Sequence, residues 1–258
     1  MLCSRSHKRI IEMSIKVQDK TINYLKHIWT YFGASIIPMA LMLAINPLIA
    51  LNMSPEDYAI TGYYSSFNSL ISPLIVFYML HYYNKRFFEL DEVGRLQLKA
   101  LLFKALTAFS FVVSVLCFLV LFGYIKIFND ELQFPIMPYL AFSVFAIPLT
   151  GLYNLELADY RMSRESRSFF RLSVFNGVLL VILNLAFVVL IKWGAAGKLI
   201  SPLVTNVAVF LYLFIKNRKL LQIKSSWRDF GEILQFCWPL TIGAMLGYFS
   251  SGFDKTFL

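Results

Sequence analysis

The hydrophobic residues of this chain gather in seven long stretches that contain no Asp, Glu, Lys or Arg. Each stretch has 17 to 22 residues, and polar segments separate them. An α-helix rises about 1.5 Å per residue, so about 20 residues cross the roughly 30 Å hydrocarbon core of a bilayer. The pattern therefore predicts an all-α membrane bundle with six complete transmembrane helices and a seventh at the C-terminus. The stretches are residues 32–51, 59–80, 105–125, 134–155, 172–191, 199–215 and 233–253.

Lys and Arg residues occupy alternate gaps between these stretches. Of the 24 cations, 20 fall in residues 1–31, 81–104, 156–171 and 216–232, and only three fall in the other gaps. Cytoplasmic loops retain Lys and Arg because these residues are costly to translocate. The alternation predicts a cytoplasmic N-terminus and a seventh helix that runs outward.

The same boundaries divide the chain into four parts. Before the first stretch, Ile22, Leu25, Trp29 and Phe32 recur at helical spacing, which predicts a short amphipathic lead-in on the inner membrane surface. We expect the chain to be truncated after its first lobe, because the seventh helix has no predicted partner. The parts are a cytoplasmic basic segment (1–31), a six-helix transmembrane lobe (32–215), a cytoplasmic linker (216–232) and the first helix of an incomplete second lobe (233–258).

Composition and charge agree with a membrane protein. Hydrophobic residues make up 58% of the chain, and the mean hydropathy is +0.64. The net charge of +9 would also suit a nucleic-acid-binding protein. Its excess cations lie on one predicted side of the membrane, where each Lys or Arg gains roughly 1 kcal/mol near anionic lipid. We therefore expect membrane lipids, and no nucleic acid, as partners.

The second stretch carries a continuous polar stripe. Its members fall at positions i, i+4, i+7, i+8 and i+11, which lie on one face of a helix. Such a stripe either lines an aqueous cavity or supplies small hydrogen-bonding residues for helix packing. The sequence leaves both uses open, and the stripe is our first candidate for substrate binding. It consists of Thr61, Ser65, Asn68, Ser69 and Ser72.

Four further residues complete the candidate substrate-binding set. Asn46 and Asn176 place amides in the first and fifth stretches, where they serve either helix packing or a hydrated interior. Asp254 and Lys255 follow the seventh stretch, whereas the first six stretches contain no charged residue. Charged residues in a span mark function by default, but near the outer interface both side chains can reach water.

Catalytic signatures are missing from the sequence. There is no HExxH, P-loop or GxSxG motif. The acidic pairs Glu56–Asp57 and Asp130–Glu131 lie in outer segments of seven and eight residues, where we expect caps rather than an acid/base pair. We therefore predict no catalytic residue, no metal ligand and no cofactor, and we expect that the protein is not an enzyme.

Four segments together carry a resemblance to a known family. In order and spacing they are similar to the Wzx-type oligosaccharide flippases, which are polysaccharide-biosynthesis membrane translocases of the multidrug/oligosaccharidyl-lipid/polysaccharide exporter superfamily. The segments are NMSPEDYAITGYYSSF (52–67), LADYRMSRESRSFFRLSVFNGVLLVILNLAFVVL (157–190), WGAAGKLISPLVTNVAVFLYLF (193–214) and FCWPLTIGAMLGYFSSGFDKTFL (236–258).

The resemblance implies a function in transport. Family members flip polyprenyl-diphosphate-linked oligosaccharides across the bacterial inner membrane for O-antigen, capsule or exopolysaccharide synthesis, and H⁺ or Na⁺ is a candidate coupling ion. Such proteins have twelve or more spans in two lobes, which this chain does not reach. Lys255 stands where the family often has Arg, so a bidentate phosphate contact would be lost there.

Two alternatives remain open at the level of sequence. A membrane polymerase or ligase for lipid-linked glycans needs outward loops with reactive side chains, and the predicted outer loops are short. A drug–cation antiporter of the same superfamily needs a buried carboxylate in the first lobe, and the first six stretches contain none.

Overall fold

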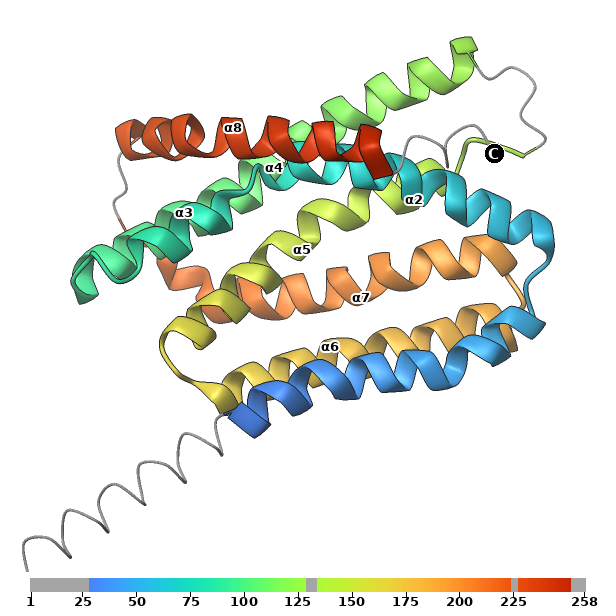
Figure 1. The fold of residues 1–258 in the computed structure, drawn as a ribbon, viewed down its shortest axis with the longest axis horizontal. Helices are drawn as coiled ribbons and strands as arrows, with labels where there is room; N and C mark the ends of the chain where they lie inside the picture. Colours follow the sequence, from blue (N-terminus) through green and yellow to red (C-terminus); the bar gives the residue numbers. More distant parts are fainter. Residues whose placement is uncertain (1–27, 129–133, 224–226, 252–258) are drawn as a thin grey trace, which may run out of the picture.

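A computed structural model describes residues 28–128, 134–223 and 227–251, and in this part of the chain helices alternate with short connections and there is no strand (Figure 1). The predicted all-α class is confirmed. Figure 1 shows long helices that lie roughly side by side. The elements are a first helix Ile28–Leu51, α2 (Pro55–Val76), α3 (Met79–Arg86), α4 (Glu92–Phe128), α5 (Tyr139–Met162), α6 (Ser166–Asn184), the π-helix η1 (Leu185–Leu190), α7 (Gly194–Asn217), the 3-10 helix η2 (Arg218–Gln222) and α8 (Trp227–Ser251).

Five of these helices are long and apolar enough to cross a membrane. Their mean hydropathy lies between 1.4 and 2.6. The helices α2 and α8 are not among the five, and in α2 the polar stripe lowers the hydropathy. The count of six complete spans and a seventh therefore stays a prediction. The five spans are Ile28–Leu51, Glu92–Ile127, Tyr139–Met162, Ser166–Leu190 and Gly194–Gln222.

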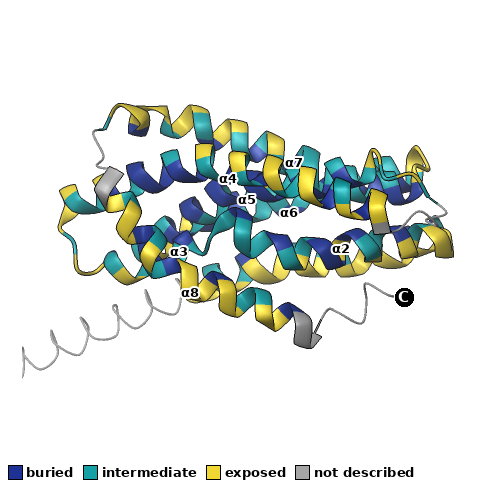
Figure 2. Cartoon of the chain, turned by 90° about the horizontal axis from the view of Figure 1, so that it is seen from above, coloured by how far each residue is buried: buried dark blue, intermediate teal, exposed yellow. Residues whose placement is uncertain are grey.

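The helix α5 is the centre of the bundle. In its most apolar part 61% of the residues are buried, against 17% to 28% in the other four spans. It packs against α2, α4, α6 and α7. The outer helices expose large apolar side chains, among them Val120 of α4 at 70% and Leu246 of α8 at 63% (Figure 2). An apolar exterior around a buried central helix fits a lipid environment.

The long helices extend beyond the uncharged stretches that predicted them, as α4, α5 and α7 illustrate. The helix α4 has 37 residues and is about 55 Å long, so part of it lies outside a hydrocarbon core of roughly 30 Å. Likewise α5 continues to Met162, and α7 continues to Asn217. We call the end where α4 begins, α5 ends, α6 begins and α7 ends the basic end, because the alternate basic gaps meet there (Figure 1).

The second predicted stretch is interrupted. Ser54 and Asp57 form a capping box at the start of α2, and Pro55 occupies its first turn. The helix ends at Val76, because Phe77 and Tyr78 both adopt left-handed backbone angles with φ of 51° and 49°. A new helix, α3, then continues toward the basic end. The expected single helix over 59–80 is therefore two helices joined by a break.

The first helix packs closely against α6. The Ser173 hydroxyl donates a hydrogen bond to the carbonyl of Ala34 over 2.8 Å. One turn further along α6, a Cβ atom added at Gly177 would lie 2.4 Å from the Cβ of Pro38. Only a glycine allows this approach. Residues before 28 lie outside the described residues, and with them Ile22 and Leu25 of the predicted amphipathic lead-in. Its other two apolar residues, Trp29 and Phe32, are exposed.

Candidate functional site

A cluster of buried charges joins three helices at the basic end. The side chain of Glu156 on α5 is only 3% exposed, and each of its carboxylate oxygens forms an ion pair with a lysine. Its Oε2 lies 3.0 Å from the Nζ of Lys99 on α4, and its Oε1 lies 2.8 Å from the Nζ of Lys216 on α7. The amide of Asn217 also donates a hydrogen bond to Oε2 over 3.2 Å. Because a buried carboxylate is costly without partners, these contacts hold Glu156 in its charged form.

One helical turn further on, Asp159 extends the cluster to α3. Its Oδ2 lies 2.5 Å from the Nζ of Lys99, and its Oδ1 accepts a hydrogen bond from the Tyr83 hydroxyl over 2.5 Å. Burial raises the pKa of Tyr83, and the hydrogen bond to Asp159 raises this pKa further. The phenol therefore remains a donor throughout the physiological pH range. The two carboxylates of α5 therefore contact side chains from α3, α4 and α7.

Sequence reasoning missed this cluster because it ended the fourth stretch at Leu155. The helix continues, so the first six helices do contain buried charge, and the expectation that they offer none is wrong. A signal was available in the sequence. Leu149, Leu152, Glu156 and Asp159 follow at three- and four-residue steps, which places both carboxylates on the face of the buried leucines.

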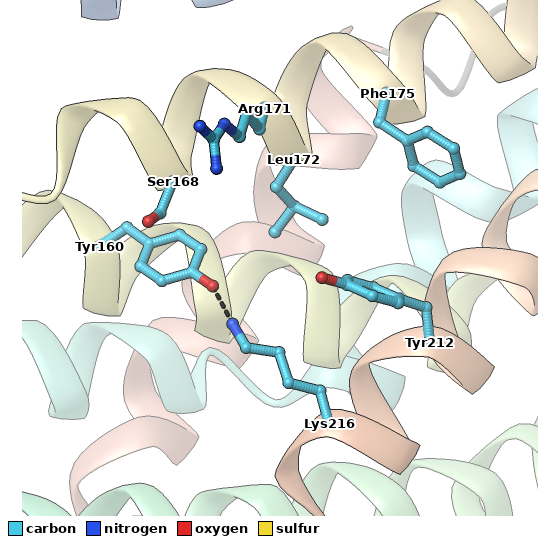
Figure 3. Close-up of a pocket in the computed structure, with 7 residues that line it drawn as sticks. All are labelled: Tyr160, Ser168, Arg171, Leu172, Phe175, Tyr212 and Lys216. Carbon is cyan, nitrogen blue, oxygen red and sulfur yellow. Dashed lines mark hydrogen bonds between the residues drawn. The ribbon is translucent and has the colours of Figure 1, made fainter.

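A pocket of about 620 Å³ opens beside the cluster, between α5, α6 and α7 (Figure 3). One wall comes from α6, where four side chains share a helical face at positions i, i+3, i+4 and i+7. The opposite wall comes from Tyr212 and Lys216, one turn apart on α7. The seven lining residues are Tyr160, Ser168, Arg171, Leu172, Phe175, Tyr212 and Lys216.

Lys216 connects the pocket to the charged cluster. Its ammonium group donates hydrogen bonds to Glu156 and to the Tyr160 hydroxyl, as the dashed line in Figure 3 marks for the tyrosine. The guanidinium of Arg171 lies across the pocket on α6 and makes no ion pair with any residue that the structure describes. The pocket therefore presents cationic donors from two facing helices.

The polar stripe of α2 is divided between packing and exposure. The Asn68 Oδ1 accepts a hydrogen bond from the Ser143 hydroxyl of α5 over 2.7 Å, which is a helix-packing contact. Ser65 and Ser69 are exposed, and Thr61 and Ser72 are half-buried. The hydroxyls of Thr61 and Ser69 donate to carbonyls of their own helix. Substrate binding by this stripe stays a prediction.

The remaining predicted residues are dispersed. Asn46 is exposed on the first helix. Asn176 lies beside the Tyr153 hydroxyl, and its Oδ1 is buried without a hydrogen-bond partner in the described part of the chain. Asp254 and Lys255 lie outside the described residues. The structure therefore does not bring the nine candidates together into one site.

Asp57 caps two helices at the opposite end of the bundle. Its Oδ2 accepts hydrogen bonds from the backbone and hydroxyl of Ser54, and its Oδ1 accepts one from the backbone N–H of Ala195 in the first turn of α7 over 2.7 Å. A Cβ atom at Gly194, which has a φ of 52°, would lie 2.4 Å from the same Oδ1. The predicted capping role is confirmed for Asp57. Asp130 and Glu131 lie outside the described residues.

Metal binding finds no support in the described geometry. No group of three or more His, Cys, Asp or Glu side chains converges among the described residues. The carboxylates of Glu156 and Asp159 both form ion pairs with lysine ammonium groups. The basic end therefore contains buried ion pairs around Glu156 and Asp159 and a pocket with cationic hydrogen-bond donors.

These features define a multi-pass, all-helical membrane protein with buried charge at one end of its bundle. Over residues 93–258 the chain matches the polysaccharide biosynthesis protein family. The chain belongs to that family, which connects it with polysaccharide synthesis or transport. No curated protein and no solved structure matches the chain.

Proposed function

We propose that the protein moves a polyprenyl-diphosphate-linked oligosaccharide across the bacterial inner membrane, for O-antigen, capsule or exopolysaccharide synthesis. In this proposal the basic end faces the cytoplasm, the bundle has six complete spans and a seventh, and the protein is a transporter rather than an enzyme. An H⁺ or Na⁺ gradient, or consumption of the cargo outside, supplies the driving force.

The observation that carries the proposal is the cluster around Glu156. Charged residues within membrane helices are costly and mark function by default. Glu156 bonds two lysines from two different helices, so a change of partner at Lys99 or Lys216 would shift α4 or α7 relative to α5. A transporter needs such a point, where helices can separate and rejoin without leaving a charge unpaired.

Family membership supports a cargo that belongs to polysaccharide synthesis. A polymerase or ligase would need reactive groups on an outward loop. The described connections at that end, 52–54, 134–138 and 191–193, hold one charged side chain, Lys192. A drug–cation antiporter would need a carboxylate that is free to accept a cation. Glu156 is buried but already compensated by two lysines, so it does not favour this alternative.

The test is transport in liposomes. The purified chain is reconstituted, a polyprenyl-diphosphate-linked oligosaccharide is added to one leaflet, and a membrane-impermeant glycosidase reports the sugar that reaches the other. We expect protein-dependent movement. Glu156→Gln should slow it at least tenfold, because one of two lysines loses its charged partner.

Glu165→Gln is the matched control, because Glu165 is exposed and lies nine residues further along the chain. We expect this variant to transport at the wild-type rate. Verified folded protein that moves no sugar would overturn the proposal. Lengthening of the glycan in the same vesicles would instead favour the polymerase alternative.

A further inference from the structure

We propose that the pocket between α5, α6 and α7 is a binding site for a glycerophospholipid whose headgroup carries one negative phosphodiester. This site is separate from the polar stripe of α2, and the proposal does not depend on glycan transport. The headgroup would lie between Arg171 and Lys216, and the acyl chains would follow the apolar surface below it.

The donors in the pocket suit a phosphodiester. The Arg171 guanidinium presents several N–H groups in a planar fork, which matches the geometry of phosphate oxygens. The Lys216 ammonium has three N–H groups. Two of them serve Glu156 and Tyr160, which leaves one for a ligand. Ser168 adds a hydroxyl on the same helical face as Arg171 (Figure 3).

The charge count favours one negative charge over two or three. In the adjoining cluster, the two lysines face the two carboxylates Glu156 and Asp159, so the cluster is neutral. Arg171 therefore contributes the single uncompensated positive charge among the residues that line the pocket. A phosphodiester balances that charge. A diphosphate would leave excess negative charge beside Glu156.

The surroundings of the pocket favour a lipid over a free anion. Phe175 and Tyr212 line the pocket and are 52% and 56% exposed. On α7 the neighbouring Leu211 and Ile215 are also exposed, at 51% and 65%, which continues an apolar surface away from the pocket. Basic pockets between transmembrane helices at the cytoplasmic interface are typical sites for anionic headgroups, and tyrosines are enriched at that depth.

The volume of about 620 Å³ is within the roughly 300–1,000 Å³ of ligand pockets. A lipid bound there would contact α5, α6 and α7 together. It would also share Lys216 with Glu156, because both would accept hydrogen bonds from the same ammonium group. Lipid binding and the ion pairs of the basic end are therefore coupled through Lys216.

The experiment measures lipid retention by the purified chain in neutral detergent. Native mass spectrometry counts bound molecules during titration with phosphatidylglycerol, phosphatidylcholine, an isoprenyl diphosphate or inorganic phosphate. We expect one phosphatidylglycerol per chain, bound about tenfold more tightly than phosphatidylcholine. Arg171→Gln should weaken phosphatidylglycerol binding about tenfold, since a charge-assisted contact is lost. Arg171→Lys should weaken it less.

Arg167→Gln separates a site from general attraction to a basic surface. Arg167 is exposed one turn before Arg171 and is not among the residues that line the pocket. This variant should bind like wild type. Equal binding by wild type and Arg171→Gln, with both proteins monodisperse, would overturn the proposal. So would Arg171-dependent binding that is tighter for isoprenyl diphosphate, or equally tight for inorganic phosphate.

Discussion

Different kinds of contact stabilise the two ends of the bundle: side-chain ion pairs at the basic end and helix capping at the opposite end. At the basic end, buried carboxylates on α5 bond lysines of α4 and α7 through side chains alone. At the opposite end, Asp57 bonds backbone N–H groups at the starts of two helices. Aromatic residues such as Tyr64 and Phe134 pack against each other in an apolar cluster. No ion pair is seen at that end among the described residues.

The difference teaches which end can change its contacts. A helix cap depends on one backbone geometry, so the contact of Asp57 with Ala195 favours one arrangement of α2 and α7. Side-chain ion pairs can exchange partners, because Lys99 already bonds two carboxylates and Glu156 already bonds two lysines. We therefore expect the basic end to change its contacts more readily than the end that holds Asp57.

The largest expected effect is the removal of Glu156. In Glu156→Ala both lysines lose a buried partner, and we expect the free energy of unfolding to fall by about 3–5 kcal/mol. Unfolding of the purified protein in mixed micelles measures this change. Hydrogen exchange should rise at the end of α5 and in the last turns of α7, and should stay unchanged near Asp57.

Glu165→Ala is the control, because Glu165 is exposed on the turn between α5 and α6. We expect its effect to stay within about 0.5 kcal/mol. A loss of protection at both ends of the bundle would break the distinction drawn above, because it would show that the two ends unfold together.

The second effect belongs to the end that holds Asp57. Asp57→Ala removes the acceptor of two helix starts, each worth about 1 kcal/mol, so we expect a loss of about 2 kcal/mol. The same unfolding measurement applies. Phosphatidylglycerol binding should be unchanged, because the pocket lies at the other end. Glu56→Ala, one residue earlier and exposed, should cost only a few tenths of a kcal/mol.

The smallest effect comes from Tyr83. Tyr83→Phe removes the hydrogen bond to Asp159, and we expect a loss of about 1 kcal/mol at neutral pH. The raised pKa of Tyr83 adds a pH dependence. Its stabilisation is complete below the ordinary tyrosine pKa of about 10 and is lost as pH rises toward the higher pKa of the folded state.

Unfolding of wild type and Tyr83→Phe from pH 8 to 11 tests this sign. The difference in stability between the two proteins should shrink above about pH 10. A difference that grows with pH would mean that Tyr83 does not hold its proton through burial and Asp159. The control is Tyr212→Phe, whose hydroxyl is on an exposed residue.

The approximate positions of the long helices followed from the sequence, because apolar stretches of membrane length are conspicuous. The ends of helices did not. Glu, Lys and Arg are good helix formers, so α4 and α5 continue through charged residues that the uncharged pattern excluded. The capping role of Asp57 was predictable from a local motif, because a Ser three residues before an acid starts a helix.

The ion pairs of the charged cluster could not be predicted from the sequence, because they join residues that are far apart in the chain. Lys99 and Glu156 are 57 positions apart, and Glu156 and Lys216 are 60 apart. No local pattern states which lysine meets which carboxylate. The pocket also depends on the pairing of α6 with α7. The nine residues predicted as a substrate site were chosen as polar or charged residues in or beside apolar stretches, and polarity on a helix face does not distinguish packing from binding.

The break at Phe77 and Tyr78 has a mechanical consequence. Two consecutive left-handed residues interrupt the helical pattern of backbone hydrogen bonds, so residues 55–86 form two separate helices rather than one continuous helix. After the break, α3 packs with α4, α5 and α8. The Cys237 thiol of α8 donates to the carbonyl of Tyr78 itself, over 3.5 Å. We therefore expect α2 and α3 to change their relative angle at Phe77 and Tyr78, and α8 contacts the chain at this break.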